Sequence, residues 1–165
     1  MKIPFHRFDG YWIFSDDIEH GTAKGAAFRI YEEDGDGLEK LPSASFELVD
    51  VSNDITEPDI STLSQSDISG VDTKLHAAIR DYALSRGAEL TEWMTARLNE
   101  LDDFRGLVAP YILNVDGRPT QFVTLRFTAN ARKIVVIGSF LIERGNVFAA
   151  SVFGTLRDIT ISKPE

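Results

Sequence analysis

The longest continuous strand signal in the pattern of hydrophobic and polar residues runs from Leu107 to Phe153, and it predicts four consecutive antiparallel strands. Asp116-Gly117 lies between two apolar runs, which is typical of a two-residue hairpin turn. Beyond it, apolar and polar residues alternate cleanly in the strand Gln121–Thr128. The last two predicted strands, Lys133–Ile142 and Val147–Phe153, are apolar on both faces.

A second pattern, with a period close to that of a helix, runs from Asp72 to Asp103. Asp72 or Thr73 would cap the first turn. Gly87 interrupts the pattern and costs about 1 kcal/mol relative to alanine inside a helix. The sequence therefore predicts either one long helix or two, Asp72–Arg86 and Glu89–Asp103, with Gly87 as the stop between them. The apolar positions are Leu75, Ile79, Tyr82, Leu90, Trp93, Leu98, Leu101 and Phe104.

Shorter strands are predicted ahead of the helical region, over Tyr11–Phe14, Ala23–Tyr31 and Ser45–Val51. Residues 52–72 read as a loop or, alternatively, as a mobile arm, because they are rich in serine and aspartate. Its isoleucines and one leucine would pack it against the sheet: Ile55, Ile60, Leu63 and Ile68. Strands, then helix, then strands are typical of a single α+β domain. We expect an antiparallel sheet of N-terminal strands plus a C-terminal four-stranded meander, packed against one long or two short helices.

The two-sided character of Lys133–Ile142 is the main functional clue. One face carries Ile134, Val136 and Phe140, and the other carries Val135, Ile137 and Leu141. Gly138 in the middle suggests a bulge or bend.

The helical region covers one face of the sheet, so the other face needs a second cover. Three covers are open: the N-terminal half of the chain, a second copy, or a protein partner. A homodimer would form by pairing the strand Val147–Phe153 across a two-fold axis. The candidate partner-binding residues are Ile134, Val136, Phe140, Phe148 and Val152.

Composition narrows the class of protein. The chain has 165 residues, no cysteine and a net charge of −9, so disulfides and thiolate metal sites are excluded. The acidic residues concentrate in the first 60 positions, which argues against a nucleic-acid partner. No apolar run approaches the roughly 18 residues of a membrane span, and the N-terminus lacks the apolar core of a signal peptide. We expect a cytoplasmic protein without membrane insertion.

Candidate catalytic and metal-binding residues are few. His6, His20 and His76 lie far apart in the sequence. The segment Asp16–His20 has the ligand types of a divalent-cation site, but acids are equally expected in a loop between strands. Glu33–Gly37 lacks the third alternating acid of a calcium loop, so a tight turn is the better interpretation. The sequence therefore predicts no catalytic residue, no bound metal and no cofactor.

Two stretches carry a family resemblance. The first is RGAELTEW (86–93) leading into RLNEL (97–101), and the second is VDGRP (115–119) before the strand 121–127. In these stretches the chain resembles the DcrB/PsbP/Mog1-like fold, which includes the bacterial DUF1795-type domains. It departs from their pattern in having a helical stretch before the matching helix and no predicted helix after the last strand. The resemblance implies a non-enzymatic binding scaffold, one branch of which acts as chaperones or adaptors that shield apolar helices of secreted effectors.

These observations favour a non-enzymatic protein-binding scaffold. It would be either a chaperone or adaptor with an aliphatic groove on the sheet, or an immunity-type inhibitor whose acidic surface is steered onto a basic partner. The alternative is a small hydrolase or small-molecule-binding domain. Its pocket would lie between the helix and the N-terminal aromatic residues Phe5, Phe8, Tyr11 and Trp12.

Overall fold

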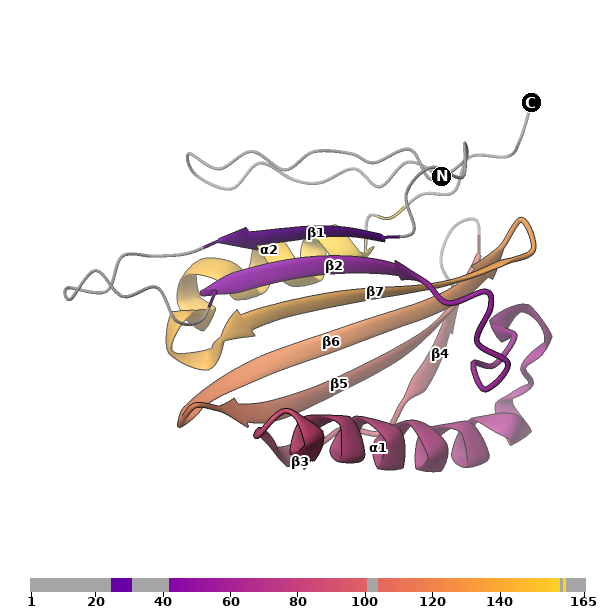
Figure 1. Cartoon of the computed structure of the whole chain (residues 1–165). Coiled ribbons are helices and arrows are strands. Elements are labelled where there is room, and N and C mark those ends of the chain that lie inside the picture. The colour runs from indigo at the N-terminus through magenta and orange to yellow at the C-terminus, as the bar shows by residue number, and fades with distance from the viewer. Residues whose placement is uncertain (1–24, 31–41, 101–103, 158, 160–165) are drawn as a thin grey trace.

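One antiparallel sheet of seven strands forms the centre of the computed structural model, which describes residues 25–30, 42–100, 104–157 and 159 (Figure 1). The strands lie in the order β1-β2-β7-β6-β5-β3, and β4 also pairs with β5. In chain order the elements are β1 (Gly25–Ile30), β2 (Ala44–Asp50), the 3-10 turns η1 (Ile60–Thr62) and η2 (Gln65–Asp67), α1 (Ile68–Ser85), β3 (Glu89–Trp93), β4 (Arg97–Glu100), β5 (Arg105–Val115), β6 (Arg118–Ala129), β7 (Arg132–Leu141), η3 (Ile142–Arg144) and α2 (Gly145–Arg157). The predicted α+β class is confirmed.

The two α-helices cover opposite faces of the sheet and opposite ends of the strand order (Figure 1). On one face α1 packs against β3, and on the other α2 packs against β7 and β2. Successive residues of a strand point to opposite faces, so Leu107 and Ala109 of β5 join the α1 side, while Val108 between them packs on the α2 side. On each face, one helix therefore covers the strands at one end of the strand order. No described α-helix covers the strands at the other end of that face.

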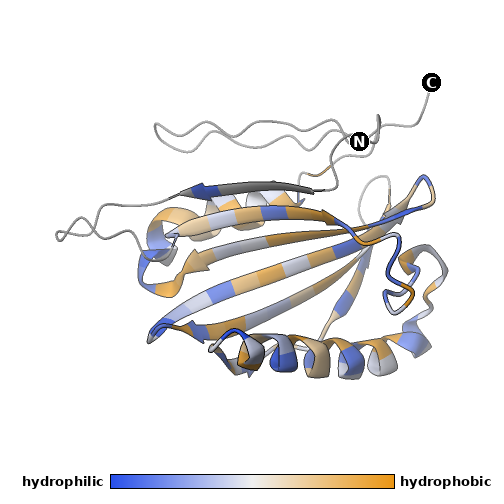
Figure 2. Cartoon of the chain, in the orientation of Figure 1, coloured by the Kyte–Doolittle hydropathy of each residue, from blue (hydrophilic) through white to orange (hydrophobic). Residues whose placement is uncertain are grey.

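The predicted hairpin at Asp116-Gly117 joins β5 to β6, and a second hairpin joins β6 to β7. The turn between β5 and β6 is formed by Asp116 and Gly117, with φ of 51° and 78°. The turn between β6 and β7 is formed by Asn130 and Ala131, with φ of 50° and 61°. Two consecutive residues with positive φ match the twist of the flanking strands. Hydrophobic residues alternate with polar ones along β6, whereas β7 is mostly hydrophobic (Figure 2).

The predicted helix Glu89–Asp103 is wrong over its described residues, which form β3 and β4 (101–103 lie outside the described residues). The register between β3 and β5 shifts between Leu90 and Glu92, as in a β-bulge. Because of the extra residue, Leu90 and Trp93 both lie on the α1 side, three positions apart. The bulge therefore gives the apolar residues of β3 the three-residue spacing that is typical of one face of a helix. The stop at Gly87 is correct: α1 ends at Ser85, and Gly87 has a φ of 74°.

Pro110 accounts for the gap between β3 and β4. It lies in the middle of β5 and has no N–H to donate to a neighbouring strand. β3 pairs with β5 on one side of this position and β4 on the other. Opposite Pro110 the edge is interrupted, and only the Met94 N–H donates to the Pro110 carbonyl, at 3.1 Å.

The predicted strand Val147–Phe153 is also wrong, because these residues belong to α2. Phe148, Val152 and Leu156 are four residues apart, a spacing that places them on one helical face. All three are buried against the sheet. The C-terminal meander therefore has three strands and is followed by a helix, and the edge strand expected to form a homodimer is absent from the described structure.

Gly138, in the middle of β7, lies where α2 packs closest to the sheet. The pairing of β7 with β2 and β6 runs through Gly138 without interruption, so there is no β-bulge at this position. A Cβ atom here would lie 2.8 Å from Val152 and 3.2 Å from Leu156. The glycine is needed for the close approach of α2.

The segment between β2 and α1 is a loop with two short 3-10 turns, tied to the sheet by polar contacts. The predicted end of the loop at residue 72 is wrong, because α1 begins at Ile68 and its N-cap is Asp67, not Asp72 or Thr73. Arg126 Nε lies 3.2 Å from Glu57 Oε2, and Lys133 Nζ donates to the Glu57 carbonyl at 2.7 Å. Ile60 is buried, as expected, but Ile55 is 96% exposed. β1 and β2 confirm two predicted N-terminal strands, and the predicted strand Tyr11–Phe14 lies outside the described residues.

Candidate functional site

The five residues proposed from sequence to bind a partner all lie in the core. Ile134, Val136 and Phe140 are 2%, 2% and 6% exposed, and Phe148 and Val152 of α2 cover them at 2% and 0%. Together they form the contact between β7 and α2. The apolar face of β7 that needed a cover is therefore covered by the chain's own last helix.

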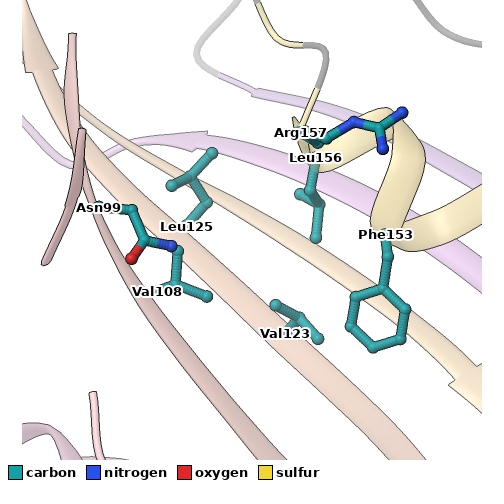
Figure 3. A pocket seen from close by; sticks show the side chains of 7 residues that line it. All are labelled: Asn99, Val108, Val123, Leu125, Phe153, Leu156 and Arg157. Carbon is teal, nitrogen blue, oxygen red and sulfur yellow. The ribbon is translucent and has the colours of Figure 1, made fainter. Parts of the chain in front are cut away.

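An apolar pocket lies beside that contact, where the C-terminal half of α2 leaves the sheet partly uncovered (Figure 3). Its volume is about 170 Å³. The floor is formed by side chains of β5 and β6, one wall by α2, and the opposite wall by β4 (Figure 3). The lining residues are Asn99, Val108, Val123, Leu125, Phe153, Leu156 and Arg157.

The pocket is apolar inside and polar at two lining positions. Val123 and Leu125 are buried at its floor, and Phe153 of α2 is 44% exposed beside them. The Phe153 ring packs edge-on against Phe140 at 5.8 Å between centroids, which fixes this wall. Asn99 and Arg157 supply the polar groups, and both are exposed.

The pocket opens onto a larger surface, which we call the open half-face. It consists of the residues of β5, β3 and β4 that point to the α2 side of the sheet. No α-helix other than α2 lies on this side within the described part of the chain (Figure 1). On β5 these residues are Val108 and Ile112, which are half-buried, and Pro110, which is buried. On the edge strands they are Glu89, Glu92, Arg97 and Asn99, which are exposed.

Charges on the open half-face are segregated along its edge. Arg97 is directly opposite Val108, a pocket residue, so it lies at the pocket end. Glu92 and Glu89 are opposite Ile112 and Asn114 at the other end. All three charged side chains are exposed, and among the described residues none of them forms an ion pair. The edge is therefore basic near the pocket and acidic away from it.

The other face of the sheet carries a row of stacked rings that belongs to the core. His76 of α1 stacks on Trp93 at 4.9 Å, Trp93 on Tyr111 at 5.6 Å, and Tyr111 on Phe122 at 5.4 Å. The Asp72 carboxylate accepts hydrogen bonds from Trp93 Nε1 and from the Ala96 N–H. The row therefore anchors α1 to the sheet, and His76 has a structural role.

No described residues form a group of three histidine, aspartate or glutamate side chains able to hold a metal ion. His6, His20 and the aromatic residues Phe5, Phe8, Tyr11 and Trp12 lie outside the described residues, as does much of the acidic first third of the chain. The expectations built on them stay predictions. No helix in the described residues is long and apolar enough to cross a membrane.

Comparison with known proteins gives no function. No family model and no curated protein matches the chain. Among solved structures, the chain is similar to PA94 from Pseudomonas aeruginosa, a protein of unknown function. The two share 8% identity with a TM-score of 0.49, over 86% of this chain and 84% of the other. A likeness at this level carries no functional argument.

Proposed function

We propose that this protein is a non-enzymatic protein-binding scaffold, and that its partner binds on the open half-face with one apolar side chain in the pocket. The observation that carries the proposal is the pocket itself. Its floor is apolar and its rim exposed, and it lies on a part of the sheet that no described helix covers. Protein interfaces draw most of their binding energy from a few anchor side chains seated in such pockets.

The size of the pocket suits an anchor residue. A dry apolar cavity of about 150 Å³ holds a benzene molecule, and this pocket has a volume of about 170 Å³. A leucine or phenylalanine side chain would fill it. Burying such a side chain contributes about 1.5–3 kcal/mol, which is a substantial part of a protein–protein interaction.

The chemistry of the lining favours binding over catalysis. Arg157 is the only ionisable residue among those that line the pocket. A guanidinium keeps its proton at physiological pH, so it cannot act as a general base. An aliphatic site without a titratable cluster is what the adaptor or chaperone version of the function requires. The same class of function is implied by the family resemblance.

Site-specific photo-crosslinking in the native host tests the proposal. A benzophenone amino acid at Asn99, on the pocket rim, should yield a discrete protein adduct. The same amino acid at Ala78, on an exposed position of α1 in the other layer, is the matched control. Adducts formed at 99 and not at 78 would support the scaffold. An adduct at twice the mass of the chain would identify the partner as a second copy.

Two results would contradict the proposal. One is the absence of any adduct at position 99 in cells where the protein is folded and expressed. The other is a small molecule that co-purifies in the pocket and is displaced by Asn99→Trp, which would favour the small-molecule-binding alternative.

A further inference from the structure

We propose that the segment bound by the open half-face is an amphipathic α-helix of a partner protein, with acidic residues beside its apolar anchor and basic residues toward its other end. This inference rests on the proposed function and adds the shape and the charge pattern of the partner. It is drawn from the width of the uncovered sheet, the position of the pocket, and the charges along the edge.

The width of the open half-face fits one helix. Neighbouring strands lie about 4.8 Å apart, so β6, β5 and the edge strands span about 10 Å. An α-helix with its side chains is about 10 Å wide. α2 already packs on β7 and β2. A second helix would therefore lie beside α2 and complete the layer on this face.

The pocket fixes where the anchor side chain enters. Phe153 and Leu156 lie on its α2 side and Asn99 on its β4 side, with Val108 and Leu125 below (Figure 3). A helix lying between α2 and β4 points one side chain down into this space. An extended strand added to the sheet edge would not reach it, because the pocket opens on the face of the sheet.

The charges on the edge strands determine which charged residues the partner helix should carry around its anchor side chain. Arg97 lies at the pocket end of the open half-face, and its side chain is exposed. Acidic side chains within a turn of the anchor would therefore face positive charge. Glu92 and Glu89 lie at the far end and would face basic side chains. Complementary charges of this kind set the register and orientation of a bound segment.

The same positions set the length of the segment. From Arg97 to Glu89 the face extends about 20 Å, because the residues opposite them on β5, Val108 and Asn114, are six positions apart at about 3.3 Å each. A helix of about 13 residues covers that distance at 1.5 Å per residue. A purely apolar helix of the same length would leave the three edge charges without partners.

The test uses the full chain and two hydrocarbon-stapled peptides of about 13 residues. Both carry a single phenylalanine anchor near one end on an otherwise alanine and leucine face. The first has glutamates beside the anchor and lysines at the far end, and in the second the two sets are exchanged. Stapling holds both peptides helical. Binding is measured by fluorescence anisotropy at low salt, and the amide shifts of Val108 and Ile112 locate the peptide.

The first peptide should bind about fivefold more tightly than the second, since each exposed charge pair contributes a modest free energy. Arg97→Glu should abolish or invert this preference. Lys74→Glu makes the same charge change on an exposed position of α1 and should leave it unaltered. Replacing the anchor phenylalanine by alanine should weaken both peptides.

Equal binding of the two peptides, or a preference that survives Arg97→Glu, would overturn the inference. If position 99 still gives a crosslinked partner in that case, the scaffold stands and only the helical, charge-patterned partner is lost. Absence of both peptide binding and the crosslink would remove the proposed function as well.

Discussion

Gly138 of β7 lies directly beneath Val152 of α2, so close that a Cβ atom on the glycine would come within 2.8 Å of the Val152 Cγ1 atom. Gly138→Ala should therefore destabilise the protein, by about 1–3 kcal/mol, as overpacked cores do. Urea denaturation measures the change. Val152→Ala in the same chain should recover part of the loss, because it removes the atom that clashes.

Gly154 of α2 provides the matched control. A Cβ atom added there meets no atom within 4 Å. Gly154→Ala should stabilise the protein by up to about 1 kcal/mol, since alanine is favoured over glycine inside a helix. Equal effects of the two glycine substitutions would contradict the close packing of α2 on β7.

Thr155 of α2 is 1% exposed, and its hydroxyl oxygen has no hydrogen-bond partner among the described residues. A buried hydroxyl without a partner costs about 1–3 kcal/mol. Thr155→Val keeps the shape of the side chain and removes the hydroxyl, so the midpoint of urea unfolding should rise. Thr155→Ser, which keeps the hydroxyl and loses the methyl group, should lower it. A lower midpoint for Thr155→Val would show that the hydroxyl is satisfied.

Arg126 and Glu57 form an ion pair whose side chains are only 9% and 18% exposed. Arg126 also donates from Nη1 to the Thr124 hydroxyl at 3.0 Å. Removal of one partner of a buried pair leaves an uncompensated charge and costs about 3–5 kcal/mol. We expect Glu57→Leu to destabilise the fold by roughly this amount.

The double variant Glu57→Leu with Arg126→Met should be more stable than the single Glu57→Leu variant, because no buried charge then remains unpaired. Denaturant titration of both variants gives the comparison. Additive losses would indicate that each side chain stabilises the fold through separate contacts.

Burial raises the pKa of Tyr111 to about 12, although the Arg126 guanidinium acts in the opposite direction. The folded state therefore favours the neutral phenol. Ionisation of Tyr111 does not reduce the free energy of unfolding at pH values below about 10, the pKa of the side chain in the unfolded chain. As the pH rises from about 10 to 12, stability should fall by about 1.4 kcal/mol per pH unit from this group. Urea denaturation across this range measures the slope, and Tyr111→Phe should reduce it. An unchanged slope would place the titrating group elsewhere.

The sequence predicted the class of the fold and three strands of the meander because their signals are local. The Asp116-Gly117 turn requires positive φ, which aspartate and glycine tolerate, and alternation marks the strand that follows it. Two predicted elements, the helix Glu89–Asp103 and the strand Val147–Phe153, were wrong because their apolar spacing matched another kind of secondary structure. The β-bulge after Leu90 gave β3 the spacing of a helix. In α2, the four-residue spacing of Phe148, Val152 and Leu156 was available but was obscured by apolar residues between them.

The candidate pocket could not be predicted for the same reason. Its floor residues, Val123 and Leu125, lie in a correctly predicted strand. Its walls come from β4 and α2, the two regions whose secondary structure was wrong, so Asn99 and Phe153 were placed on other elements. A pocket that lies between two elements can be predicted only when the secondary structure and the position of both elements are known. The charge segregation of the edge likewise depends on the register of β3 and β4 against β5.

The pairing of β2 with β7 has a consequence for how the chain is made. The Ser45 and Ser139 hydroxyls lie 2.6 Å apart across this pair, yet the two serines are 94 residues apart in the chain. At a synthesis rate of about 5–20 residues per second, β2 leaves the ribosome roughly 5–20 s before β7 is available. The hairpins of β5, β6 and β7 close locally, so β2 joins an existing sheet. During that interval Phe46 and Leu48, which end in the core, have no strand β7 to pack on. During synthesis β2 therefore exposes an unpaired strand edge, a known risk for aggregation, and a slower ribosome would prolong that exposure.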